Sequence, residues 1–194
     1  MLEVGFACGK TPSTHPGEIA ESGLLASVPL PKLTYCTRAL DGCVARGSLS
    51  DLQLEGALHA CQRHTALTAG TRSGFFLGDG AGVGKGRQIS AIILDNFARG
   101  RTKHVWFSIA SDLKLDAERD LADVGCHTVV IDGCKSLDTN DKLAFGSAVA
   151  KKGVLFSTYS TLISSLSAKG PRLDQLVQWC GGTNFEGCII FDEA

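Results

Sequence analysis

The chain has 194 residues, of which 44% are hydrophobic and 20% are charged, and its formal net charge is −1. This composition is typical of a globular protein with a substantial core, and the near-zero charge excludes a global basic field for nucleic acid. The sequence contains no apolar run of the roughly 18 residues that span a membrane, so we expect no membrane partner. The first residues also lack the basic start and apolar stretch of a secretory signal.

The N-terminal quarter of the chain differs from the rest. Residues 1–47 hold four of the five prolines and many small polar residues, which predicts loop with short extended pieces at 24–28 and 33–35. Order begins near residue 48, where Ser50 and Gln53 match the capping box that starts a helix. One face of that helix carries apolar residues at helical spacing, namely Leu54, Ala57, Leu58 and Cys61. We therefore divide the chain into a loop-rich segment, 1–47, and an ordered domain, 48–194.

Within the ordered domain, short apolar runs alternate with helical patterns. Strands are predicted at residues 74–77, 105–109, 127–131, 153–158 and 188–192. Helices are predicted at residues 85–98, 112–123, 141–150, 159–167 and 172–180. Such alternation indicates an α/β fold, in which a mostly parallel sheet is covered by helices on both faces. Five strands are enough for a RecA-like P-loop core.

A glycine-rich turn, residues 78–86, lies between a predicted strand and a predicted helix. Such a turn directs backbone N–H groups and the positive end of the helix dipole at one point, which suits a phosphate. In the P-loop pattern G-x-x-x-x-G-K-S/T, Asp79 replaces the first glycine and Gly86 replaces the hydroxyl residue that normally binds Mg²⁺. We expect Lys85 to contact the β/γ-phosphates. The predicted nucleotide-binding residues of the turn are Gly80, Gly82, Gly84, Lys85, Gly86 and Arg87.

Two acids, Asp192 and Glu193, follow the last predicted strand. On their own they fit a solvated strand end, but together with the glycine turn they predict a nucleotide site. Asp192 would hold Mg²⁺ through a water, and Glu193 would act as the catalytic residue that orients and polarises the attacking water. Another P-loop class, such as a kinase or GTPase, remains an alternative, although no N/T-K-x-D guanine signature occurs.

Read together, these segments resemble the Strawberry notch family, a branch of the superfamily 2 helicase-like ATPases. The resemblance covers about residues 48–194 and rests on residues 49–55, 78–87, 105–108, 111–114, 116–121, 156–160, 185–187 and 191–193. The Gly-Lys-Gly-Arg ending of the turn is unusual among P-loop proteins and similar to this family's own version. By this resemblance, Gly86 is a family feature rather than a defect of this chain.

The resemblance also implies roles for residues outside the turn. Gln53 corresponds to a glutamine that reads adenine, although a capping-box glutamine needs no ligand. The segment with Ser108, Ser111 and Lys114 corresponds to a motif that touches a nucleic-acid strand, although Ser111 or Asp112 also suits an ordinary helix cap.

The family implies the ATP-binding first motor lobe of a helicase-type ATPase that uses ATP and Mg²⁺. It further implies a nuclear protein that acts with nucleic acid or chromatin and with transcription regulators. A second RecA-like lobe, which supplies an arginine finger in such ATPases, has no counterpart here, so we expect a fragment that ends after its Walker B acids and hydrolyses ATP very slowly by itself. The alternative is a catalytically weak P-loop interaction domain that serves as a co-regulator scaffold.

Overall fold

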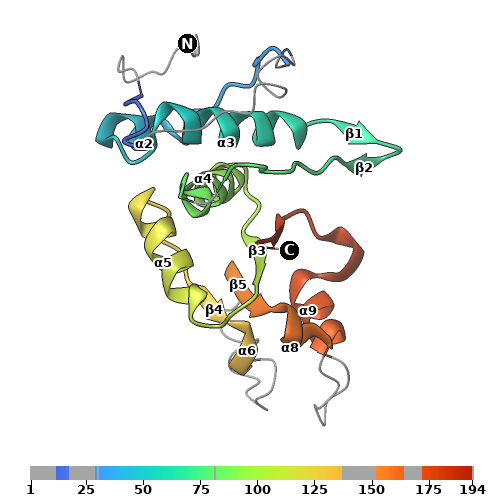
Figure 1. Ribbon diagram of the computed structural model, residues 1–194. Coiled ribbons are helices and arrows are strands. Elements are labelled where there is room, and N and C mark those ends of the chain that lie inside the picture. The colour runs from blue at the N-terminus through green and yellow to red at the C-terminus, as the bar shows by residue number, and fades with distance from the viewer. Residues whose placement is uncertain are drawn as a thin grey trace. The chain divides into compact units, whose positions relative to one another are not determined.

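The computed structural model describes residues 12–17, 29, 31–80, 82–136, 152–163 and 172–193. The chain divides into two compact units. The first unit holds residues 1–95 and 123–125, and the second holds residues 96–122 and 126–194. Figure 1 shows the elements of both units.

The first unit is built on helices. Helix α3, Asp51–Arg63, begins at the predicted capping box: Gln53 N–H donates to Ser50 Oγ over 3.3 Å, and Ser50 N–H donates to Gln53 Oε1 over 3.1 Å. The predicted apolar face is confirmed, because Leu54, Ala57 and Leu58 are fully buried. A short helix that the sequence analysis did not predict, α2 (Asp41–Arg46), precedes α3 and ends at Gly47 with a φ of 68°.

A small hairpin and an irregular segment lead from α3 to the glycine turn. Strands β1 (Leu67–Thr68) and β2 (Thr71–Arg72) pair antiparallel where the sequence analysis expected only a polar link. The strand predicted at residues 74–77 is wrong, because residues 73–80 form no strand. Phe76 is 88% exposed, so the apolar run is not buried as a core strand would be. A run of three apolar residues between glycines is too short for its pattern to distinguish a strand from an extended loop.

The second unit contains a four-stranded parallel sheet. Its order is β4-β5-β3-β6, with β4 at Val130–Asp132, β5 at Gly153–Thr158, β3 at Lys103–Ser108 and β6 at Ile189–Phe191. Trp106 of β3 lies opposite Phe156 of β5 and Ile190 of β6. Because all pairs are parallel, the carboxyl ends of the strands meet at one edge. The predicted parallel sheet is thus confirmed.

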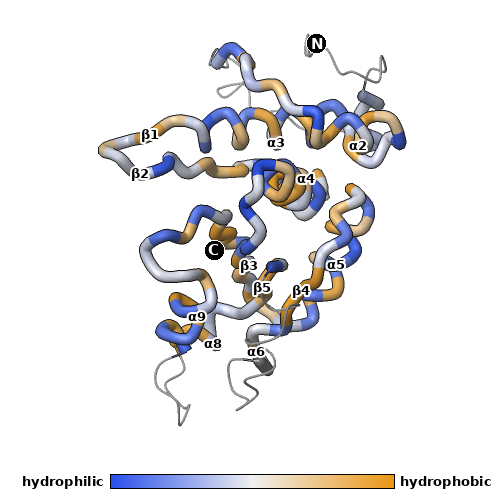
Figure 2. Tube along the Cα trace, turned by 180° about the vertical axis from the view of Figure 1, so that it is seen from behind, coloured by the Kyte–Doolittle hydropathy of each residue, from blue (hydrophilic) through white to orange (hydrophobic). Residues whose placement is uncertain are grey.

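The two central strands of the sheet, β3 and β5, are buried on both faces. Val105, Phe107 and Leu155 pack with two residues of helix α9 (Arg172–Cys180), Leu176 and Trp179. Trp106 and Phe156 point to the opposite face, since successive side chains alternate along a strand, and they are 2% and 1% exposed. Figure 2 shows β4 and β5 coloured mostly as hydrophobic.

Helix bounds agree with the sequence pattern where the periodicity is strong. Helix α4 spans Lys85–Ala98 and α9 spans Arg172–Cys180, as predicted, and α5 spans Leu113–Asp123. Helix α8, Tyr159–Ile163, covers the described part of the helix predicted at 159–167. The short elements α6 (Gly133–Ser136) and η2 (Gly182–Asn184) were not predicted. The helix predicted at 141–150 lies outside the described residues.

His104 of β3 is a fully buried polar side chain in the second unit. Its Nδ1 accepts a hydrogen bond from Cys188 N–H over 3.1 Å, so its Nε2 carries the proton and donates to the Arg101 carbonyl over 3.0 Å. The ring also lies 4.9 Å from that of Phe97. Burial lowers the pKa of His104 to about 4, the bond to the Arg101 carbonyl opposes this, and the Arg101 charge adds to it.

Acid should therefore destabilise the second unit through His104. The unfolded chain binds a proton at this residue below pH 6.5, whereas the folded chain binds it only near pH 4, so stability is lost as the pH falls through this window. We expect the free energy of unfolding of wild type to fall by up to about 3 kcal/mol more than that of His104→Gln. Urea unfolding of both proteins at several pH values measures this, and equal losses would contradict it.

Candidate nucleotide site

The glycine turn forms the start of helix α4. Gly82 and Gly84 have φ angles of 87° and 84°, which only glycine adopts without strain. Helix α4 begins at Lys85, so the N–H groups that precede Arg87 have no acceptor inside the helix, whereas the Arg87 N–H donates to the Gly84 carbonyl over 3.1 Å. A left-handed residue followed by a helix start makes a concave set of N–H groups, which is a suitable cradle for phosphate oxygens.

Lys85 is held close to the turn. Its Nζ donates to the carbonyl oxygens of Asp79 and Gly80 over 3.0 and 3.2 Å. The cation therefore lies beside the N–H cradle, as a lysine that binds β/γ-phosphates requires. Gly86, directly after it, has no hydroxyl to offer a metal ion.

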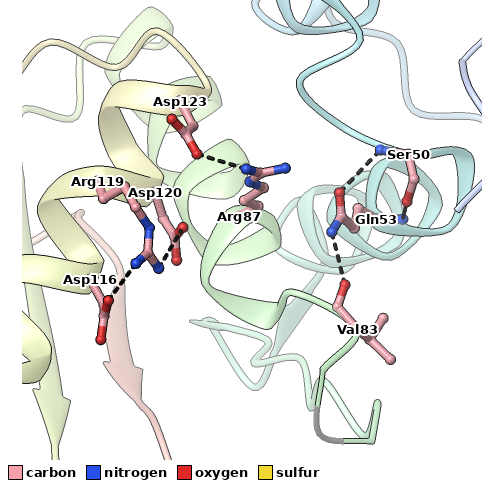
Figure 3. A network of polar contacts seen from close by, with 8 residues as sticks. All are labelled: Ser50, Gln53, Val83, Arg87, Asp116, Arg119, Asp120 and Asp123. Atoms are coloured by element: carbon pink, nitrogen blue, oxygen red, sulfur yellow. Dashed lines mark hydrogen bonds and ion pairs between the residues drawn. The ribbon is translucent and has the colours of Figure 1, made fainter. Parts of the chain in front are cut away.

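The structure connects Gln53 to the turn. Its Nε2 donates to the Val83 carbonyl over 2.8 Å, while its Oε1 caps α3 at Ser50 (Figure 3). The side chain is 6% exposed, and a Cβ on Gly84 would overlap its Nε2. The capping role is thus confirmed. Adenine contact stays a prediction, and it would use the second N–H and the second lone pair of the amide.

The guanidinium and the backbone N–H of Arg87 both contact residues of the first unit. Its guanidinium forms an ion pair with Asp123 at 2.8 Å (Figure 3). Its backbone N–H donates to the Gly84 carbonyl over 3.1 Å. Its predicted role in nucleotide binding stays a prediction. These contacts would leave the phosphate to the N–H groups that precede Arg87.

The carboxylates belong to the second unit. Asp192 directly follows β6 at the carboxyl edge of the sheet, where its N–H continues the ladder to the Phe107 carbonyl over 2.9 Å. Its Oδ2 accepts from the buried indole N–H of Trp106 over 3.3 Å, which orients the carboxylate. Glu193 follows with a φ of 54° and an exposed side chain. Parallel α/β sheets bind their ligands at this edge, so an acid here is well placed for a binding site.

Tyr159 supports the same corner of the sheet. Its hydroxyl donates to the Asp192 carbonyl over 2.8 Å. Partial burial raises the pKa of Tyr159, and the negative charges of Asp192 and Glu193 raise it further, so the phenol keeps the proton that it donates. Neither Tyr159 nor Trp106 was singled out as a site residue from the sequence, because only the folded sheet brings them beside Asp192.

The residues predicted to contact nucleic acid lie after β3. Ser108 is fully buried, and its hydroxyl has no hydrogen-bond partner among the described residues. Ser111 is exposed, and its carbonyl accepts from the Lys114 N–H over 3.3 Å. Lys114 Nζ pairs with Glu118 at 2.5 Å. Contact with a nucleic acid stays a prediction for all three, and for Ser108 it would require the hydroxyl to become uncovered.

The described part of the chain contains neither a metal-binding cluster nor a helix that could span a membrane. No three His, Cys, Asp or Glu side chains there are grouped so that they could hold a metal ion. Among the described helices, none combines the length and the apolar character that a membrane span requires.

A family model decides the classification. The model of the P-loop containing NTP hydrolase pore-1 family matches residues 14–194. The chain belongs to this family. Membership confirms the predicted α/β P-loop fold class, to which the four-stranded parallel sheet also conforms. No solved structure matches the chain.

Curated relatives of this member of the pore-1 family confirm the resemblance to Strawberry notch proteins. Human protein strawberry notch homolog 2 is 46% identical over 183 residues. Protein FORGETTER 1 of Arabidopsis thaliana is 47% identical over 180 residues, and protein strawberry notch of Drosophila melanogaster is 42% identical over 184. Each alignment covers 92% of this chain but only 13%, 14% and 11% of the respective relative. The chain thus spans about an eighth of the length of these relatives.

The contact between Gln53 and the turn can be tested with two glycines. Gly84→Ala should lower the free energy of unfolding by about 2 kcal/mol, about half from the left-handed φ and half from displacing the Gln53 amide. Gly70→Ala is the matched control, because Gly70 has a φ of 80° and no atom near an added Cβ, so it should lose only about 1 kcal/mol. Urea unfolding measures both, and equal losses would show that the contact contributes nothing.

Proposed function

We propose that this chain is the ATP-binding first motor lobe of a Strawberry notch-like helicase-type ATPase. The observation that carries the proposal is the phosphate cradle: left-handed glycines at 82 and 84 lead into α4, whose first residue, Lys85, lies beside the turn. Membership of a P-loop NTP hydrolase family supports the same reading.

The proposal assigns a role to each predicted site residue. The N–H groups near Gly84 and the ammonium of Lys85 would bind the phosphates. Asp192 would hold Mg²⁺ through water, and Glu193 would orient and polarise the attacking water. Bound Mg²⁺ would supply neutralisation of phosphate charge. The fit is good for Asp192, whose carboxylate Trp106 orients at the sheet edge.

In the whole protein we propose that this lobe works with a second RecA-like lobe, on nucleic acid or chromatin and with transcription regulators in the nucleus. The similarity to Strawberry notch proteins over nearly the whole chain supports this assignment. The ordered domain proposed for residues 48–194 would then be the motor part, and residues 1–47 would be a separate segment.

One observation favours a second candidate, a P-loop interaction domain that binds nucleotide poorly. The turn has no hydroxyl at Gly86, and the Lys85 ammonium is already bonded to two carbonyls of the turn itself. A phosphate must compete with these bonds.

Substitution of Lys85 distinguishes an ATP-binding motor lobe from an interaction domain that binds nucleotide poorly. Lys85→Ala should weaken the binding of a fluorescent ATP analogue with Mg²⁺ by about tenfold or more, because it removes one charged hydrogen-bond donor from the phosphates. Lys32→Ala, which alters an exposed lysine of the first unit, should leave the affinity unchanged. Titration by fluorescence anisotropy measures both. Equal signals from wild type and Lys85→Ala would favour the interaction domain, and competition by GTP as strong as by ATP would favour another P-loop class.

A further inference from the structure

Asp79 introduces a negative charge into a turn that is proposed to bind phosphate. It occupies the place of the first glycine in the P-loop pattern. A carboxylate that faced the phosphates would repel them, and the effect would be large because a partly buried site screens charge poorly. The turn therefore needs a way to direct this side chain elsewhere.

Gln88 of α4 holds the Asp79 carboxylate. Its Nε2 donates to Asp79 Oδ2 over 2.5 Å, and the Gln88 side chain is fully buried. Lys85, one turn earlier on the same helix, donates to the Asp79 carbonyl over 3.0 Å. The first turn of α4 thus fixes both the backbone and the side chain of Asp79.

Gly56 of α3 makes room for this contact. A Cβ at Gly56 would overlap Gln88 Oε1, so the amide occupies the space that a side chain would fill. Gln88 Oε1 is buried with no hydrogen-bond partner among the described residues. The amide cannot turn over, because its oxygen would then face the Asp79 carboxylate. The amide is therefore oriented so that its Nε2 donates to the Asp79 carboxylate, at the expense of a partner for its Oε1.

We propose that Gln88 is a positioning residue of the phosphate turn. It draws the Asp79 carboxylate onto α4 and away from the phosphates, and Gly56 is the small residue that permits this. The inference rests on the proposed function, since it explains how a turn that contains an acid can bind ATP. It assigns Gln88 no contact with the nucleotide.

A double-mutant cycle tests the electrostatic part of this role. Gln88→Ala should weaken ATP binding by about tenfold, because the freed carboxylate repels the phosphates. Asp79→Asn removes the charge and keeps an acceptor for Gln88, so it should bind ATP at least as well as wild type. In the Asp79→Asn background, Gln88→Ala should cost little affinity. An equal loss in both backgrounds would mean that Gln88 acts only through packing and would overturn the proposal.

Gly56→Ala provides an independent test that leaves Gln88 and Asp79 in place. Alanine favours a helix interior over glycine by about 1 kcal/mol, and displacing the buried Gln88 amide costs about as much, so the thermal midpoint should change little. ATP affinity should nevertheless fall about tenfold, and Gly56→Ala should add no loss to Gln88→Ala. Gly42→Ala in α2 is the control helix glycine and should leave ATP affinity unchanged. An unchanged affinity of Gly56→Ala would overturn the proposal.

Hydrogen exchange without nucleotide separates this inference from the proposed function. If wild type bound no ATP, the proposed function would fail, and the contact would be judged by exchange in residues 78–84. Exchange that is faster there in Gln88→Ala than in wild type, by more than in the rest of the first unit, supports the positioning role. Equal exchange overturns it, whatever the affinity for ATP.

Discussion

The side-chain amide of Gln53 is the contact on which the first unit depends. Its Oε1 accepts a hydrogen bond from Ser50 N–H at the start of α3, and its Nε2 donates to the Val83 carbonyl in the glycine turn. Because the amide is buried, losing either bond would leave a polar group unsatisfied, at a cost of about 1–3 kcal/mol. The helix start and the turn are therefore fixed relative to each other, and Gly84 must remain small and left-handed beside Nε2.

The turn departs from the P-loop pattern at Asp79 and Gly86, and the hydrogen bonds of the structure bear on both positions. Gln88 holds the carboxylate of Asp79 and Lys85 holds its carbonyl, so both groups are bound to helix α4. Gly86 has no hydroxyl to offer, and in the second unit Trp106 and Tyr159 fix the side chain and the backbone of Asp192. In each unit a neutral N–H donor thus orients a carboxylate: Gln88 holds that of Asp79, and Trp106 holds that of Asp192.

Sequence pattern predicted the parts of this fold that have strong local signals. Helices α4 and α9 and strand β5 have the predicted bounds, because their periodicity and length are unambiguous. The strand at 74–77 failed, since three apolar residues between glycines carry no strand-specific signal. Of the candidate site, the pattern identified Lys85 and Asp192. It could not find the partners Gln88 and Trp106, because such contacts join residues that only tertiary packing brings together.

The central claim is that the turn around Gly84 and Lys85 binds the phosphates of ATP. Backbone amide chemical shifts recorded by NMR during an ATP and Mg²⁺ titration test it most directly. The largest shifts should fall on residues 82–86, with a second set at Asp192 and Glu193, and inorganic pyrophosphate should reproduce the first set. Shifts that leave residues 82–86 unchanged would contradict the claim, even if ATP bound elsewhere on the chain.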